Sequence, residues 1–81
     1  MAMKGFGVQV TIRAADGRAG RVQPLVVVAR DERDAERVAA AAVRDAADAQ
    51  TLRALTADEV RNYDLDLDRH GDAKSLPALN F

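Results

Sequence analysis

The sequence predicts a single small α+β domain, residues 1–81, in which an antiparallel or mixed sheet carries one long helix on one face. Three observations predict this fold. Residues 6–13 alternate apolar and polar side chains, which is typical of a half-buried strand. Residues 32–49 instead repeat apolar side chains at helical spacing. The length of 81 residues leaves room for one core, which we expect at residues 6–68, with a tail at 69–81.

Two strands joined by a turn are expected first. In residues 6–13 every second side chain is apolar, and three of these four are β-branched. Asp16-Gly17 is a turn pair, since glycine adopts positive φ without steric cost. The second strand covers Val22 and residues 25–29. Pro24 has no N–H for a ladder, so we expect it at a bulge, at an edge or at the start of this strand. The pair is most simply an antiparallel hairpin with a basic loop.

Two helices follow, each with a recognisable start. Asp31 is a good N-cap for the long helix, which we expect over about residues 32–49, and its alanine-rich stripe would let it lie close to the sheet. Thr56 and Glu59 then fit a capping box, with apolar residues at the two positions of a hydrophobic staple. This pattern predicts a short helix over about residues 57–62.

A third strand is expected at residues 63–68, where the alternation returns. Tyr63, Leu65 and Leu67 would face the core, while the three intervening aspartates would face solvent. Residues 69–72 form a turn, and Pro77 argues against a helix through the tail. The predicted order is therefore strand, strand, helix, short helix, strand.

Composition excludes several kinds of chemistry. The chain has no cysteine, so a disulfide, a thiolate zinc site and a cysteine nucleophile are excluded. The single histidine, His70, falls in a predicted turn and is expected to be a surface residue. The aspartates of residues 63–68 are spaced like the opening of a calcium loop, but Arg69 and Ser75 stand where such a loop needs glycine and glutamate. We therefore expect no enzyme activity, no metal and no cofactor. Apolar runs such as residues 25–29 are too short to span a membrane, and the start has no signal-peptide stretch. We therefore expect a cytoplasmic protein of a bacterial or phage-infected cell.

Charge is unevenly distributed along the chain. Residues 1–30 carry five basic and one acidic side chain, whereas residues 31–81 carry seven basic and twelve acidic ones. This asymmetry predicts an acidic surface for a protein partner with a basic surface. Its candidate residues are Asp58, Glu59, Asp64, Asp66, Asp68 and Asp72. On a strand, the aspartates at 64, 66 and 68 would repeat about every 6.6 Å, comparable to the spacing of phosphates along a nucleic-acid strand. An ordinary solvated strand face that blunts a sheet edge is the alternative interpretation.

A second hypothesis uses the basic hairpin. Arg13, Arg18 and Arg21 cluster around the predicted loop and could contact phosphates, as in a small nucleic-acid-binding or transcription-regulating accessory protein. A homodimer is a separate expectation. It is motivated by the small core and by three apolar residues of the tail, Leu76, Leu79 and Phe81.

Residues 6–13, the Asp16-Gly17 turn and residues 26–35 together form a strand–turn–strand–helix pattern. This pattern resembles small ββα accessory proteins of phages and mobile elements, some of which are anti-CRISPR proteins. It covers about residues 6–43 and carries no functional residues with it. The resemblance implies a non-enzymatic inhibitor that blocks a basic nucleic-acid-binding or subunit surface of a CRISPR effector.

Overall fold

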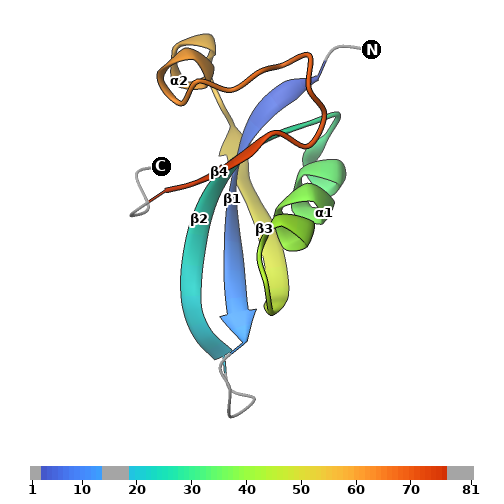
Figure 1. Cartoon of the computed structure of the whole chain (residues 1–81), viewed down its shortest axis with the longest axis vertical. Coiled ribbons are helices and arrows are strands. Elements are labelled where there is room, and N and C mark those ends of the chain that lie inside the picture. Colours follow the sequence, from blue (N-terminus) through green and yellow to red (C-terminus); the bar gives the residue numbers. More distant parts are fainter. Residues whose placement is uncertain (1–2, 14–18, 77–81) are drawn as a thin grey trace.

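A computed structural model describes residues 3–13 and 19–76 and shows a four-stranded antiparallel sheet with two helices (Figure 1). The elements in chain order are β1 Lys4–Arg13, β2 Ala19–Ala29, α1 Glu32–Ala42, β3 Ala46–Ala54, α2 Ala57–Asn62 and β4 Ala73–Ser75. The strand order across the sheet is β3-β1-β2-β4. The α+β class is confirmed. The predicted order of elements is wrong, because the strand β3 separates the two helices. The single long helix is also wrong, because α1 has only 11 residues.

The hairpin of β1 and β2 is the centre of the sheet, and its pairing runs from Lys4 opposite Ala29 to Arg13 opposite Ala19. Pro24 lies inside β2, opposite Gln9. Its carbonyl accepts a hydrogen bond from the Leu76 N–H (2.9 Å), on the side away from β1. The nitrogen and carbonyl of a strand residue point to the same side, so the missing N–H removes nothing from the hairpin. The predicted turn at Asp16-Gly17 lies outside the described residues.

Helix α1 begins as predicted and ends seven residues early. The Asp31 side chain caps the helix by accepting a hydrogen bond from the Asp34 N–H. The helix ends at Ala42, because Val43 adopts an extended backbone and Asp45 has a φ of 62°. The chain thereby turns back, and residues 46–54 pair along β1. The hydrogen bonds that residues 46–54 form with β1 outweigh the helix propensity of their alanines.

Strand β3 is an edge strand with two irregularities. Its register against β1 shifts between Gly7 and Val8 and again between Thr11 and Ile12. Each shift leaves one extra residue in β3, Leu52 and Ala47, as in a β-bulge. The outer edge is tied to α1, because the Thr51 N–H donates to the Glu36 carboxylate (2.9 Å). A bulged and partly covered edge is a common defence against pairing with other chains.

The third strand predicted at residues 63–68 is wrong, and this segment consists of turns with Asp64 at a φ of 56°. The fourth strand is instead β4, which pairs with the outer edge of β2 around Lys74 opposite Val26. Hydrogen bonds between the backbones of residues 71–72 and Val28 (3.0 and 2.8 Å) lead the chain into β4. The segment expected as a tail therefore contributes a strand and the buried side chain of Leu76.

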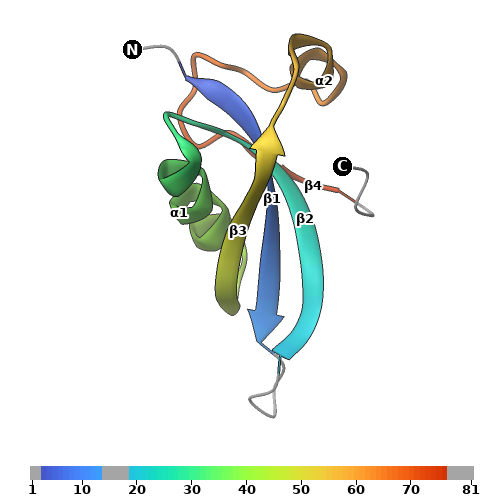
Figure 2. The same ribbon diagram turned by 180° about the vertical axis from the view of Figure 1, so that it is seen from behind.

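The core occupies both faces of the sheet, with a different cover on each (Figures 1 and 2). One face packs against α1 and contains Phe6, Val8, Val10, Leu25, Val27, Ala29, Ala35 and Ala39. The other face is covered by residues 55–76 and contains Val26, Val28, Leu65 and Leu76. Close approach on this second face needs glycine at position 5, since a Cβ there would stand 2.9 Å from Val60 Cγ2. Of the three side chains expected in the core from residues 63–67, Leu65 is buried, Tyr63 half-buried and Leu67 exposed.

Candidate functional site

The acidic segment, residues 58–72, folds as helix α2 followed by a series of tight turns. The Tyr63 N–H donates to the Glu59 carbonyl (2.9 Å), and the Asp64 N–H donates to the Arg61 carbonyl (3.1 Å). The Asp66 carboxylate then accepts from the Asp68 N–H (2.9 Å), as short polar side chains do in turns. Asp64, Asp66 and Asp68 therefore do not form an evenly spaced row on a strand, which corrects the spacing expected above.

The six predicted acidic residues divide into two groups. Asp58, Asp64, Asp66 and Asp68 are exposed, and the first two leave 85% and 99% of their side chains accessible. Glu59 and Asp72 are half-buried and serve the fold. The Asp72 carboxylate accepts from the Asp66 N–H (3.0 Å) and closes the turn segment. The exposed surface is thus made of four aspartates.

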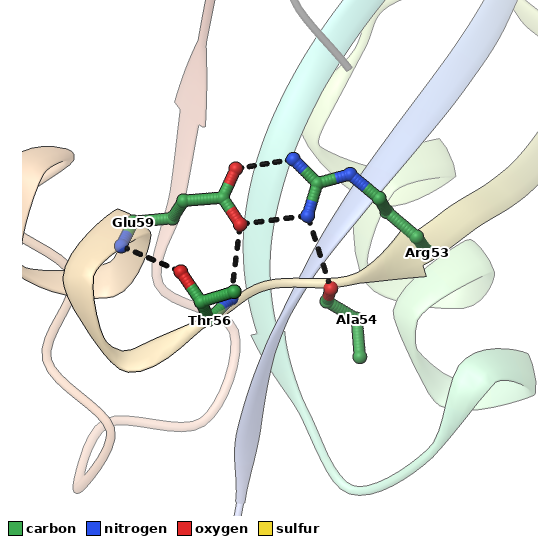
Figure 3. Close-up of polar contacts among 4 residues, drawn as sticks. All are labelled: Arg53, Ala54, Thr56 and Glu59. Carbon is green, nitrogen blue, oxygen red and sulfur yellow. Dashed lines mark hydrogen bonds and ion pairs between the residues drawn. The ribbon is translucent and has the colours of Figure 1, made fainter.

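Glu59 is held by the strongest polar network of the acidic segment (Figure 3). Both of its oxygens pair with the Arg53 guanidinium, and one of these contacts, from Arg53 Nη1, measures 2.6 Å. The predicted capping box is present, with Thr56 Oγ1 accepting from the Glu59 N–H and the Glu59 carboxylate accepting from the Thr56 N–H. Pairing with Arg53, together with the hydrogen bond from Thr56, lowers the pKa of Glu59 to about 2. Glu59 therefore joins the end of β3 to α2.

The exposed aspartates have weaker partners. Asp58 Oδ1 lies 3.2 Å from Arg61 Nη2, and both side chains are exposed. Asp64 Oδ2 lies 3.8 Å from Lys74 Nζ, which also donates to the Asp64 carbonyl (2.9 Å). Exposed pairs of this kind contribute little, so these carboxylates stay available to a partner. Among the residues that the structure describes, Asp66 and Asp68 form no salt bridge.

Sequence reasoning missed a contact between Asp34 and His70. Asp34 Oδ2 accepts from the Arg30 N–H (3.0 Å) and lies 2.7 Å from His70 Nε2. The hydrogen bond from Arg30, followed by the one from His70, lowers the pKa of Asp34 below its ordinary value. His70 keeps 40% of its side chain exposed and is nonetheless bonded to a buried carboxylate 36 residues away in sequence. No local pattern relates two residues at that separation.

The basic residues of the second hypothesis lie at the other end of the molecule. Arg13 and Arg21 are exposed at the end of β1 and near the start of β2, whereas Arg18 lies outside the described residues. The hairpin end and α2 lie at opposite ends of the long axis, which measures 40 Å (Figure 1). The hairpin arginines are therefore far in space from the acidic segment.

In residues 3–13 and 19–76 no pocket is found. The same described residues include no group of three or more histidine, aspartate or glutamate side chains placed to hold a metal ion. None of the described helices has the length and apolar character needed to cross a membrane.

Comparison with known proteins gives no family: no protein-family model matches the chain, and no curated protein or solved structure matches it either.

Proposed function

We propose that this chain is a non-enzymatic protein-binding module, an inhibitor or accessory factor that occupies a basic surface of its partner through its acidic segment. The observation that carries the proposal is the group of four exposed aspartates, Asp58, Asp64, Asp66 and Asp68, at one end of the molecule. The partner class suggested by the ββα resemblance is a CRISPR effector, whose basic nucleic-acid-binding or subunit surface would be blocked.

The turn hydrogen bonds support this proposal by limiting what binding would cost in conformational freedom. The backbone of the segment is fixed by the Asp66, Asp68 and Asp72 contacts, so little ordering remains to be done on binding. Repulsion among neighbouring carboxylates would be relieved when lysine or arginine side chains of a partner come close. Electrostatic contacts of this kind raise the association rate and weaken as salt is added.

The test compares two charge-matched sets of substitutions. The triple variant Asp64→Asn, Asp66→Asn, Asp68→Asn removes three exposed carboxylates from the acidic segment. The control Glu32→Gln, Asp45→Asn, Asp48→Asn removes three exposed carboxylates elsewhere. A partner is captured from extracts of the native host with the wild-type chain, and its affinity for each variant is measured by calorimetry.

We expect the acidic-segment variant to bind at least about tenfold more weakly, which corresponds to about 1.4 kcal/mol, and the control to bind as the wild type does. Unchanged affinity in both variants would show that the acidic segment does not contact the partner, which would contradict the proposal. The CRISPR element is tested separately, by expressing the chain in cells that carry a targeting CRISPR system. Survival of the targeted plasmid supports it, and normal clearance in every system type argues against it.

The basic hairpin supports a second candidate function, a nucleic-acid-binding or transcription-regulating accessory protein. The observation that favours it is the exposure of Arg13 and Arg21 at the end of the sheet remote from the acidic segment. A salt-sensitive gel shift that is lost in Arg18→Ala or in the Arg13→Ala, Arg21→Ala double variant supports this function. The absence of any shift at low salt removes it.

A homodimer is a separate proposal, motivated by the small core and by three apolar residues of the tail. Leu76 is buried in the second core of its own chain, whereas Leu79 and Phe81 lie outside the described residues. Sedimentation at high micromolar concentration tests the proposal: a dimeric mass supports it and a monomeric mass contradicts it.

A further inference from the structure

The outer face of helix α1 carries arginines. The inner face is set by the buried residues Ala35 and Ala39, which pack on the sheet. At 100° per residue, Arg33 and Arg37 point to the opposite side of the helix, as do Ala40 and Ala41. All four are exposed, as is Arg44 in the turn after the helix. We name Arg33, Arg37 and Arg44 the arginine ridge.

Three of the five carboxylates in residues 31–45 are turned away from this ridge, whereas Glu32 and Asp45 are exposed. Asp31 accepts from the Asp34 N–H at the helix cap. Asp34 is held by the Arg30 N–H and His70, and Glu36 reaches to the Thr51 N–H on the edge of β3. Within the part of the chain that the structure describes, no salt bridge joins a carboxylate to any member of the ridge. Acidic and basic side chains three or four residues apart could pair along the helix, but the packing of α1 draws Asp34 and Glu36 away from the arginines.

The chemistry of the ridge selects a phosphate partner. Guanidinium groups match phosphate oxygens with two parallel hydrogen bonds. Arg33 and Arg37 lie one turn apart, about 6 Å along the helix axis, and can contact separate phosphates of one strand. Protein–protein hot spots are enriched in Trp and Tyr as well as Arg, and the exposed face of α1 offers no aromatic residue beside its arginines, only Ala40 and Ala41. It also carries no Asn or Gln side chain, the amides that read adenine edges.

We propose that the arginine ridge binds the phosphate backbone of nucleic acid without sequence preference. This goes beyond the proposed function, which uses the acidic segment, and uses a surface different from the hairpin arginines. The two basic surfaces adjoin, because the Arg13 N–H donates to the carbonyl of Asp45, the residue after Arg44 (2.8 Å). Binding through two or three phosphate contacts is weak and is strongly reduced by salt.

The experiment measures fluorescence anisotropy of a labelled random-sequence DNA duplex of about 20 base pairs with the full chain, from about 50 to 200 mM salt. The test variant is Arg33→Ala, Arg37→Ala, which keeps good helix formers on an exposed face. The matched control is Arg61→Ala, Arg69→Ala, which removes two exposed arginines from the acidic end. Circular dichroism establishes that each variant is folded, and polyglutamate serves as a competitor without phosphate.

We expect the wild type to bind, the ridge variant to bind at least about tenfold more weakly, and the control to change less than about twofold. The slope of log K against log salt should fall in magnitude by about 1.8 in the ridge variant, for two lost phosphate contacts. The proposal is overturned if the wild type does not bind at about 50 mM salt, if both variants lose affinity equally, or if polyglutamate competes as well as DNA of equal charge. The last outcome would indicate an acidic protein surface as the partner. The Arg13→Ala, Arg21→Ala variant distinguishes failure of this proposal from failure of the hairpin candidate.

Discussion

His70 Nε2 lies 2.7 Å from Asp34 Oδ2 and joins the turn after α2 to the first turn of α1. The Asp34 carboxylate is nearly buried, with 11% of its side chain accessible, and it also accepts from the Arg30 N–H. The two residues after His70, Gly71 and Asp72, form backbone hydrogen bonds with Val28. This one contact therefore connects α1, which covers one face of the sheet, to the segment of residues 55–76, which covers the other face.

Replacing His70 by alanine should destabilise the fold. A hydrogen bond to a charged group contributes about 1.5–3 kcal/mol, and partial exposure reduces this, so we expect a loss of about 1 kcal/mol. Urea unfolding at pH 7 measures the difference, with the exposed neighbour Arg69→Ala as the control. Equal stability of His70→Ala and the wild type would show that the contact does not hold the turn segment in solution.

The Arg53–Glu59 pair should make stability depend on pH in the acid range. The folded pKa of Glu59, about 2, lies below its ordinary value of 4.5, so its contribution is complete above the ordinary value and is lost as the pH falls toward 2. Glu59→Gln should therefore be less stable than the wild type at neutral pH, and the gap should close as the pH falls from about 4.5 to about 2.

The control for the Glu59 experiment is Thr56→Ala in the same capping box. The Thr56 hydroxyl does not titrate and is the smallest of the influences that lower the Glu59 pKa, so its loss should cost about 1 kcal/mol with much less dependence on pH. Urea unfolding at several pH values measures both variants. A pH-independent gap for Glu59→Gln would contradict the depressed pKa.

Gly5→Ala should overpack the second face of the sheet. The new methyl would stand 2.9 Å from Val60 Cγ2 and 3.1 Å from Leu55 Cδ1, and a β-branched valine has little freedom to move away. We expect a loss of about 1–3 kcal/mol. Val60→Ala should relieve the clash, so the double variant should be more stable than the sum of the two single effects predicts. If the effects of the two substitutions on stability are strictly additive, the loss in Gly5→Ala comes from the β1 backbone and not from the contact with Val60 in α2.

The turn between α1 and β3 should reject a β-branched residue. Asp45 has a φ of 62°, which aspartate tolerates and valine does not. Asp45→Val should cost about 1–2 kcal/mol, whereas Asp45→Gly should be close to neutral, because glycine relieves the strain but adds freedom to the unfolded chain. Thermal unfolding followed by circular dichroism compares the two. A tolerated valine would show that this turn has another conformation in solution.

Local signals predicted what local chemistry decides. The cap at Asp31 and the capping box at Thr56 and Glu59 each depend on residues within a few positions, and the structure contains both. The β1–β2 hairpin follows from two strand patterns that are neighbours in the sequence, and it is present as well. Composition likewise separates a basic first third of the chain from a more acidic remainder.

The remaining strands and the contacts between helices and turns depend on the tertiary structure. Residues 46–54 have helical composition but lie beside the open edge of β1, and the sheet offers them a ladder that only the folded hairpin provides. Residues 63–68 alternate like a strand, yet β4 at residues 73–75 takes the outer edge of β2, held by the contacts of residues 71–72 with Val28. The Asp34–His70 contact and the arginine ridge likewise depend on which side of α1 meets the sheet. Local patterns predict the first hairpin, the starts of both helices and the charges that these elements carry, because caps and alternation act over a few residues. Pairing partners and free surfaces are set by contacts between distant segments, which no local pattern encodes.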